Sequence, residues 1–156
     1  MFSTQVSYKL RYGVSAWGSG KSTALQKLNL LNDRAVKNLK QPSETVQSAY
    51  KRLKLFTINS LYKFETAKFI KLFKDGELPA EFDSIGEPIN HHHQTRIAMQ
   101  INYQLPHVRT DLGKSSIKFQ GIKVWNNLPE QIKNQNGTSF KKQLKTHILE
   151  HQLSQD

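Results

Sequence analysis

The chain has 156 residues and no cysteine, and its 23 Lys and Arg against 12 Asp and Glu give a formal net charge of +11. This length suits one domain, and the lack of cysteine excludes a disulfide scaffold, thiolate metal ligands and a cysteine nucleophile. The positive charge favours polyanionic partners, nucleic acid first, and no segment has the long apolar run that a membrane span needs.

The N-terminal residues lack the basic and apolar regions of a secretory signal. We therefore expect an intracellular protein, in the nucleus or the cytoplasm, without a membrane partner. Hydrophobic residues make up 37% of the chain, so we expect a lean core.

The charge lies mainly in residues 1–78, which hold 14 Lys and Arg against 5 Asp and Glu. We expect this basic part to be helical. From residue 25 to residue 39, apolar residues recur every three or four positions, which predicts a helix with these side chains on one stripe: Leu25, Leu28, Leu31, Ala35 and Leu39. Pro42 ends this helix, and Ser43 with Glu44 predicts the start of a shorter one.

A further helix is predicted from about Ser60 to Lys74. Asn59 or Ser60 would cap its N-terminus, and Gly76 follows its end. Its aromatic and leucine side chains are expected in the core.

Residues 79–156 form a second part with more turn residues. Residues 83–93 predict a loop. Apolar residues alternate over Arg96–Tyr103 and Ser115–Phe119, which predicts two strands of a hairpin. A helix capped by Thr138 or Ser139 is expected from Ser139 to Leu153. The predicted fold is therefore mainly α with a small β-hairpin (α+β), and its two parts, 1–78 and 79–156, pack as one domain.

Residues 18–23 read Gly-Ser-Gly-Lys-Ser-Thr, like the end of a phosphate-binding P-loop. Lys21 would then reach the β and γ phosphates and Ser22 would hold magnesium. The full pattern needs a glycine at the position of Ser15, however, and no β-branched run precedes the loop. We favour a loop before a helix capped by Ser22, with a nucleotide site as the less favoured alternative.

No catalytic or metal site is predicted. His91, His92 and His93 are adjacent, but tight metal sites draw ligands from spacings that a rigid element directs to one centre. We favour a solvated loop. The acidic residues are scattered, without an Asp-x-Asp pair for two-metal chemistry.

Three motifs follow one another in the second part. Residues 109–113 read Arg-Thr-x-x-Gly, residues 121–129 read Gly-x-x-x-Trp-Asn-x-Leu-Pro, and residues 140–145 read Phe-Lys-Lys-x-Leu-Lys. Looser agreement precedes them, including Tyr12-Gly13 with Trp17-Gly18, and Leu61 to Phe64. In this order the motifs resemble the C-terminal region of jockey-like non-LTR retrotransposon reverse transcriptases, from Tyr12 to Leu149.

The resemblance implies a family that copies RNA into DNA, with magnesium held by palm aspartates in an F/Y-A-D-D-type motif. That motif is absent from this chain. The resemblance thus implies a non-catalytic fragment of an RNA-directed DNA polymerase from a transposable element, without a cofactor of its own. Its partners would be RNA or single-stranded DNA, and the missing polymerase core. The alternative is a structural module that is stable only against that core.

Lys and Arg side chains in the second part are candidates for phosphate contacts, and Tyr103 and Trp125 among them could stack on bases. The expected nucleic-acid-binding residues are Arg96, Arg109, Lys114, Lys118, Lys123, Lys141, Lys142 and Lys145. For Trp125 a core position is favoured, and Arg109 could instead pair with Asp111.

A second footprint remains open in the helical first part, where the charge is stronger. Its residues are Lys51, Arg52, Lys54, Lys63, Lys68, Lys71 and Lys74.

Overall fold

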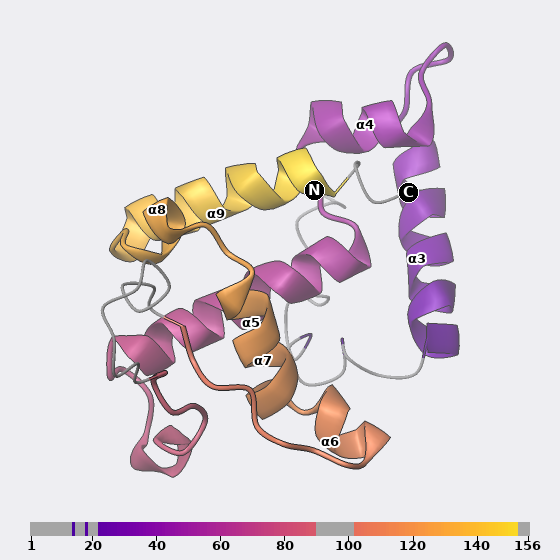
Figure 1. Ribbon diagram of the computed structural model, residues 1–156. Coiled ribbons are helices and arrows are strands. Elements are labelled where there is room, and N and C mark those ends of the chain that lie inside the picture. Colours follow the sequence, from indigo (N-terminus) through magenta and orange to yellow (C-terminus); the bar gives the residue numbers. More distant parts are fainter. Residues whose placement is uncertain (1–13, 15–17, 19–21, 90–101, 153–156) are drawn as a thin grey trace. The chain divides into compact units, whose positions relative to one another are not determined.

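The computed structural model describes Val14, Gly18, residues 22–89 and residues 102–152, and its regular elements over these residues are all helical (Figure 1). The prediction of a mainly α fold is confirmed. In chain order the elements are α3 (Ser22–Lys37), α4 (Val46–Leu53), α5 (Ile58–Lys74), a 3-10 turn (Ala80–Phe82), α6 (Asp111–Ser115), α7 (Ile117–Asn126), α8 (Glu130–Lys133) and α9 (Gly137–His151).

The chain divides into two compact units. Unit 1 consists of Met1–Phe64 and Leu144–Asp156, and unit 2 consists of Glu65–Gln143. Both boundaries fall inside helices, so α5 and α9 each contribute residues to both units.

In unit 1, α4 lies across the C-terminal end of α3 (Figure 1). The helix that we expected over residues 25–39 is present as α3, but the stripe of leucines is not its buried side. Leu31 and Leu39 are 58% and 50% exposed, whereas Val36 is buried against Ala49 and Tyr50 of α4. Polar groups orient α3 in this way, because the Tyr50 hydroxyl donates to Asp33 Oδ1 at 2.8 Å and turns the Asp33 side towards α4.

Local hydrogen bonds set both ends of α4. Its N-cap is Thr45, whose Oγ1 accepts from the Ser48 N–H at 3.2 Å, rather than Ser43 or Glu44. Lys54 ends the helix in the left-handed region at φ 51°. Glu44 instead binds Arg52, and its carboxylate accepts two guanidinium hydrogen bonds of 2.9 Å.

Helix α5 begins two residues before the predicted start. Thr57 precedes it, and its Oγ1 accepts from the Ser60 N–H at 3.3 Å, so neither Asn59 nor Ser60 is the cap. Gly76 follows the end at φ +70°, as expected of a glycine after a helix.

The C-terminal part of α9 belongs to unit 1. The Gln152 side chain accepts from Thr57 N–H at 3.3 Å and donates to the Leu55 carbonyl at 3.1 Å. Helix α9 begins at Gly137, so the predicted caps Thr138 and Ser139 lie inside its first turn. The backbone N–H groups of Ser139 and Phe140 in this turn donate instead to the Asn136 carbonyl.

The predicted β-hairpin in unit 2 is wrong for the part that the structure describes. Residues 115–119 end α6 and begin α7, because the Ser116 hydroxyl accepts from the Phe119 N–H and caps a helix there. Of the other predicted strand, only Asn102 and Tyr103 are described. They are extended and pair with Glu87 to Ile89 through one antiparallel bridge, Pro88 to Tyr103.

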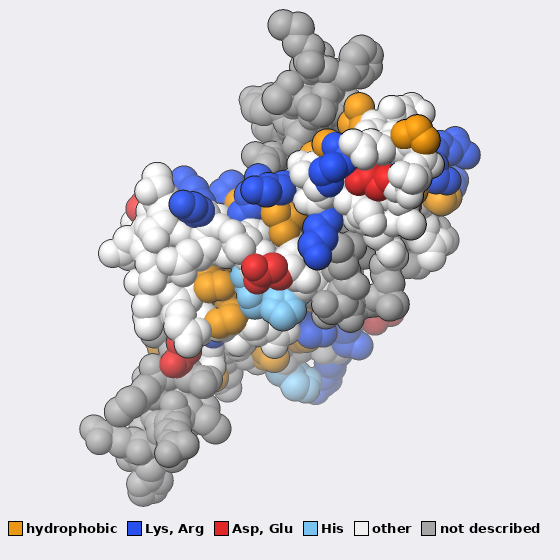
Figure 2. Space-filling model, turned by 90° about the horizontal axis from the view of Figure 1, so that it is seen from above, with side chains coloured by type: hydrophobic (Ala, Val, Ile, Leu, Met, Phe, Trp, Pro, Cys, Tyr) orange, Lys and Arg blue, Asp and Glu red, His pale blue; other side chains and the backbone are white. Residues whose placement is uncertain are grey.

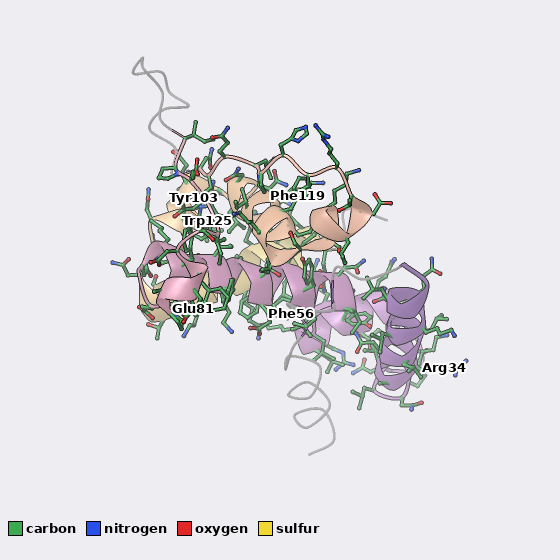
Figure 3. All side chains as sticks on the ribbon, turned by 90° about the horizontal axis from the view of Figure 1, so that it is seen from below. Arg34, Phe56, Glu81, Tyr103, Phe119 and Trp125 are labelled. Carbon is green, nitrogen blue, oxygen red and sulfur yellow. The ribbon has the colours of Figure 1, made fainter. Side chains whose placement is uncertain are left out.

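The core of unit 2 surrounds Trp125, which is 0% exposed and packs against Phe140 at a ring-centroid distance of 6.2 Å. Trp125 and Tyr103 lie near each other in Figure 3. Next to Trp125, the Asn126 amide group binds the Tyr103 backbone twice. It accepts from the Tyr103 N–H at 3.1 Å and donates to the Tyr103 carbonyl at 2.8 Å. Residues 102 and 103 are thereby fixed to α7.

We expect Asn126→Ala to destabilise unit 2 by about 2 to 4 kcal/mol, because it leaves one donor and one acceptor of the Tyr103 backbone without their partner. Native-state hydrogen exchange at the Tyr103 amide measures this directly and should accelerate roughly 30-fold or more.

The matched control is Asn127→Ala, since Asn127 is exposed and adjacent. It should change stability by no more than about 0.5 kcal/mol. Equal exchange rates in the two variants would show that the Asn126 amide does not hold this segment.

Candidate nucleic-acid interface

The cations that we predicted as a nucleic-acid site do not flank a hairpin. Arg109 lies just before α6, Lys114 on α6, and Lys118 and Lys123 on α7, and all four are exposed. Lys141 and Lys142 are exposed on the unit 2 part of α9, whereas Lys145 is half-buried in unit 1. Arg96 lies outside the described residues.

The aromatic side chains among these cations are not available for stacking. Tyr103 and Trp125 are both buried, so the prediction that they could contact bases is wrong, and the favoured core position of Trp125 is confirmed. The Tyr103 ring packs against Phe73 at 5.4 Å between centroids. A contact of nucleic acid with this surface would therefore rest on phosphates alone.

Acidic residues largely offset the positive charge of unit 2. It contains 11 Lys and Arg against 8 Asp and Glu, a net charge of +3. The Lys114 ammonium lies 3.5 Å from Asp111, so Asp111 pairs with Lys114 and not with Arg109 as the alternative had it.

Unit 1 carries most of the positive charge. It contains 12 Lys and Arg against 4 Asp and Glu, a net charge of +8. Figure 2 shows Lys and Arg side chains spread over one face of the molecule, with Asp and Glu side chains among them. Residues 22–64 contain two acidic residues. Asp33 accepts a hydrogen bond from Tyr50 and Glu44 pairs with Arg52, so both have internal partners.

The remaining cations of α3 and α4 form what we call the α3–α4 basic surface. All are exposed, and within the described residues none has an ion pair: Lys27, Arg34, Lys37, Lys51 and Lys54. Figure 3 shows Arg34 at the outer side of α3. Positive charge without neighbouring carboxylates is the feature that a phosphate backbone recognises.

The second footprint considered from the sequence is only partly at the surface. Lys71 is buried, with its ammonium 2.9 Å from Asp75 and 5.8 Å from the centre of the Phe140 ring. Lys68 pairs with Glu65, and Lys74 donates to the Lys133 carbonyl at 3.3 Å. These three lysines are therefore held by neighbours in unit 2.

A buried lysine that the sequence reasoning did not single out lies in unit 2. Lys133 is 2% exposed, and its ammonium donates to Asn102 Oδ1 at 2.7 Å and to the Asn126 carbonyl at 3.2 Å. Burial lowers the pKa of Lys133 and also that of Lys74, since both lose hydration of the charged form. Lys133 is the last residue of α8, a position where a lysine is ordinarily exposed, and no sequence signal distinguishes it.

Two further motifs lie largely outside the described residues. Of Gly18 to Thr23, the structure describes Gly18 and the first residues of α3, Ser22 and Thr23, whereas Lys21 lies outside the described residues. Gly18 has a packing role, because a Cβ there would overlap the Tyr62 ring. His91, His92 and His93 are outside the described residues.

Over the described ranges, no three His, Cys, Asp or Glu side chains gather as they would around a metal ion. Within the same ranges, no helix is long and apolar enough to cross a membrane.

Comparison with known proteins gave no match to a family model, a curated protein or a solved structure.

We expect the free energy of unfolding of unit 2 to rise with pH between the lowered folded-state pKa of Lys133 and the pKa of an ordinary lysine. The folded-state pKa of Lys133 lies below its ordinary value of 10.5. Between these two values the unfolded chain holds a proton that the folded chain has released, so raising the pH favours folding. Below the folded-state pKa this gain is absent. Lys74 acts in the same direction.

Urea unfolding in a Trp17→Phe background, followed by Trp125 fluorescence, measures this slope. Lys133→Met should flatten it, whereas Lys141→Met, which removes an exposed lysine of the same unit, should leave it unchanged. An identical slope in both variants would contradict the assignment to Lys133.

Proposed function

We propose that the protein is a non-catalytic module that binds RNA or single-stranded DNA through the phosphate backbone. The observation that carries this proposal is the α3–α4 basic surface, with five exposed cations and no acidic side chain left to neutralise them in residues 22–64. Each phosphate that such a cation neutralises releases a bound counterion, and this release drives binding.

We further propose that the binding has little sequence preference. Base recognition requires side chains that reach base edges or stack on them. The aromatic residue of α4, Tyr50, is buried and bonded to Asp33, and α3 contains no aromatic residue. The cations alone recognise charge and not sequence.

The resemblance to the C-terminal region of jockey-like non-LTR retrotransposon reverse transcriptases supports the same proposal. In that family, RNA-directed DNA synthesis would be carried out by a palm with its aspartate motif, which this sequence lacks. The module would support that synthesis by holding template or nascent hybrid, and magnesium would belong to the polymerase.

A labelled single-stranded RNA titrated at increasing salt tests the proposal. We expect Lys51→Gln with Lys54→Gln to weaken binding and to reduce the slope of log affinity against log salt by about 1.4, since each lost phosphate contact accounts for about 0.7. The matched control is Lys118→Gln with Lys123→Gln, which removes the same charge from unit 2.

A smaller effect of the control would support the α3–α4 basic surface. A larger effect of the control would move the footprint to α7, and no binding even at low salt would refute nucleic-acid binding altogether.

A second candidate is a structural module that is stable only against a polymerase core. Exposed leucines in unit 2 favour it, above all Leu112, which is 83% exposed. This candidate predicts weak hydrogen-exchange protection and aggregation of the isolated chain. Strong protection of the α5 and α7 amides in a monomeric sample would contradict it.

A further inference from the structure

The solvent side of α3 carries leucines as well as cations. Leu30 and Leu31 are 60% and 58% exposed, although they lie in the middle of a 16-residue helix. Leucines exposed to this extent next to each other form an apolar patch, and such patches on otherwise polar surfaces mark interaction sites.

The helix places these leucines between two cations. Lys27 lies three and four residues before Leu30 and Leu31, and Arg34 lies three and four residues after Leu31 and Leu30, so all four share one face. Lys37 extends the same face by a further turn. We call this set, Lys27, Leu30, Leu31, Arg34 and Lys37, the Leu–cation face.

The opposite side of α3 is occupied within unit 1. Val36 is buried against α4, Asp33 binds Tyr50, and the Asn32 amide donates to the Phe56 carbonyl at 3.2 Å. The packing of unit 1 therefore uses the side of Val36, Asp33 and Asn32, and its described residues leave the Leu–cation face exposed.

Phosphate binding accounts for the cations of this face but not for its leucines. Nucleic acid gains nothing from two aliphatic side chains at the centre of a contact, since leucine neither stacks on bases nor bonds to phosphate. A protein surface with an apolar centre and a charged rim matches both features, because this is how specific protein interfaces are built.

We propose that the Leu–cation face binds an acidic amphipathic helix of another protein. Leucines of that helix would cover Leu30 and Leu31, and its carboxylates would pair with Lys27 and Arg34. The charge of the face selects this occupant. A second copy would bring Lys27 and Arg34 against the same cations on a unit of net charge +8. An anionic membrane is less suited, since the exposed apolar part of this face consists of two adjacent leucines, whereas interfacial helices insert a broad apolar face.

A synthetic helical peptide of three heptads, with Leu at a and d and Glu at e and g, tests the proposal on the full chain. Its glutamates keep it from pairing with itself at neutral pH. We expect binding by fluorescence anisotropy, and a loss of about tenfold or more in Leu30→Ser with Leu31→Ser. The matched control, Leu112→Ser, alters a still more exposed leucine of unit 2 and should bind as the unaltered chain does.

A charge reversal gives an independent measurement if the serine variant is unstable. Lys27→Glu with Arg34→Glu should lose the acidic peptide and gain a peptide of the same heptads with Lys at e and g. The serine variant should keep the RNA affinity of the unaltered chain within about twofold, since it changes no charge. A failure of RNA binding would therefore leave this proposal standing. A failure of peptide binding would likewise leave the proposed nucleic-acid binding standing.

Three results would overturn the proposal. The first is equal binding of a peptide with Glu at e and g but Ser at a and d, which would leave charge alone as the cause. The second is a dimer of the chain that Leu30→Ser with Leu31→Ser dissociates. The third is capture of the chain by phosphatidylserine vesicles through Leu30 and Leu31, without binding to the peptide.

Discussion

The interior of unit 2 depends on polar groups that are buried with their partners. The Asn126 amide satisfies both backbone groups of Tyr103, and the Lys133 ammonium binds Asn102 and the Asn126 carbonyl. A buried polar group without a partner costs roughly 1 to 3 kcal/mol, and a charged one costs more. These bonds therefore determine where residues 102 and 103 lie against α7 and α8, and the apolar packing around Trp125 closes over them.

Asn126 also belongs to the central motif of the resemblance to the reverse transcriptases, residues 121–129. In the central motif, Trp125 and Leu128 are buried, and Gly121 lies so close to Ile70 that a Cβ would come within 2.8 Å of it. In Arg-Thr-x-x-Gly, the threonine is a helix cap, since Thr110 Oγ1 accepts from the Gly113 N–H at 3.1 Å. These motifs specify packing and turns. The exposed cations within them, Arg109, Lys123, Lys141 and Lys142, have no such packing role.

Much of the helical content could be predicted from the sequence. Leucine and phenylalanine spacing indicated α3, α5 and α9, and their ends differed by a few residues because the caps depend on individual hydrogen bonds, such as that of Thr57. Helix α7 was not predicted, because the strand prediction used only the alternation of Ile117 and Phe119. The longer series Ile117, Gly121 and Trp125 has the spacing of a helix.

The candidate surface was less predictable. The number of cations follows from the sequence. Whether carboxylates lie next to them depends on contacts with residues far away in the sequence. Tyr50 turns Asp33 inward across 17 positions, and this bond both removes a carboxylate from the surface of α3 and exposes Leu31. Lys71 and Lys133 are buried because of their partners in the fold, and composition does not predict such partners.

The two proposed binding sites overlap on α3. Lys27, Arg34 and Lys37 belong to both the α3–α4 basic surface and the Leu–cation face, whereas Lys51 and Lys54 belong only to the former. An acidic helix paired with Lys27 and Arg34 would neutralise two of the three shared cations, so each ligand would weaken the other by the same factor. Nucleic acid would keep its contacts on α4 while the acidic helix was bound. Such partial overlap makes the two ligands antagonistic without making them exclusive, and the leucines, which contribute only to the protein contact, separate the two effects.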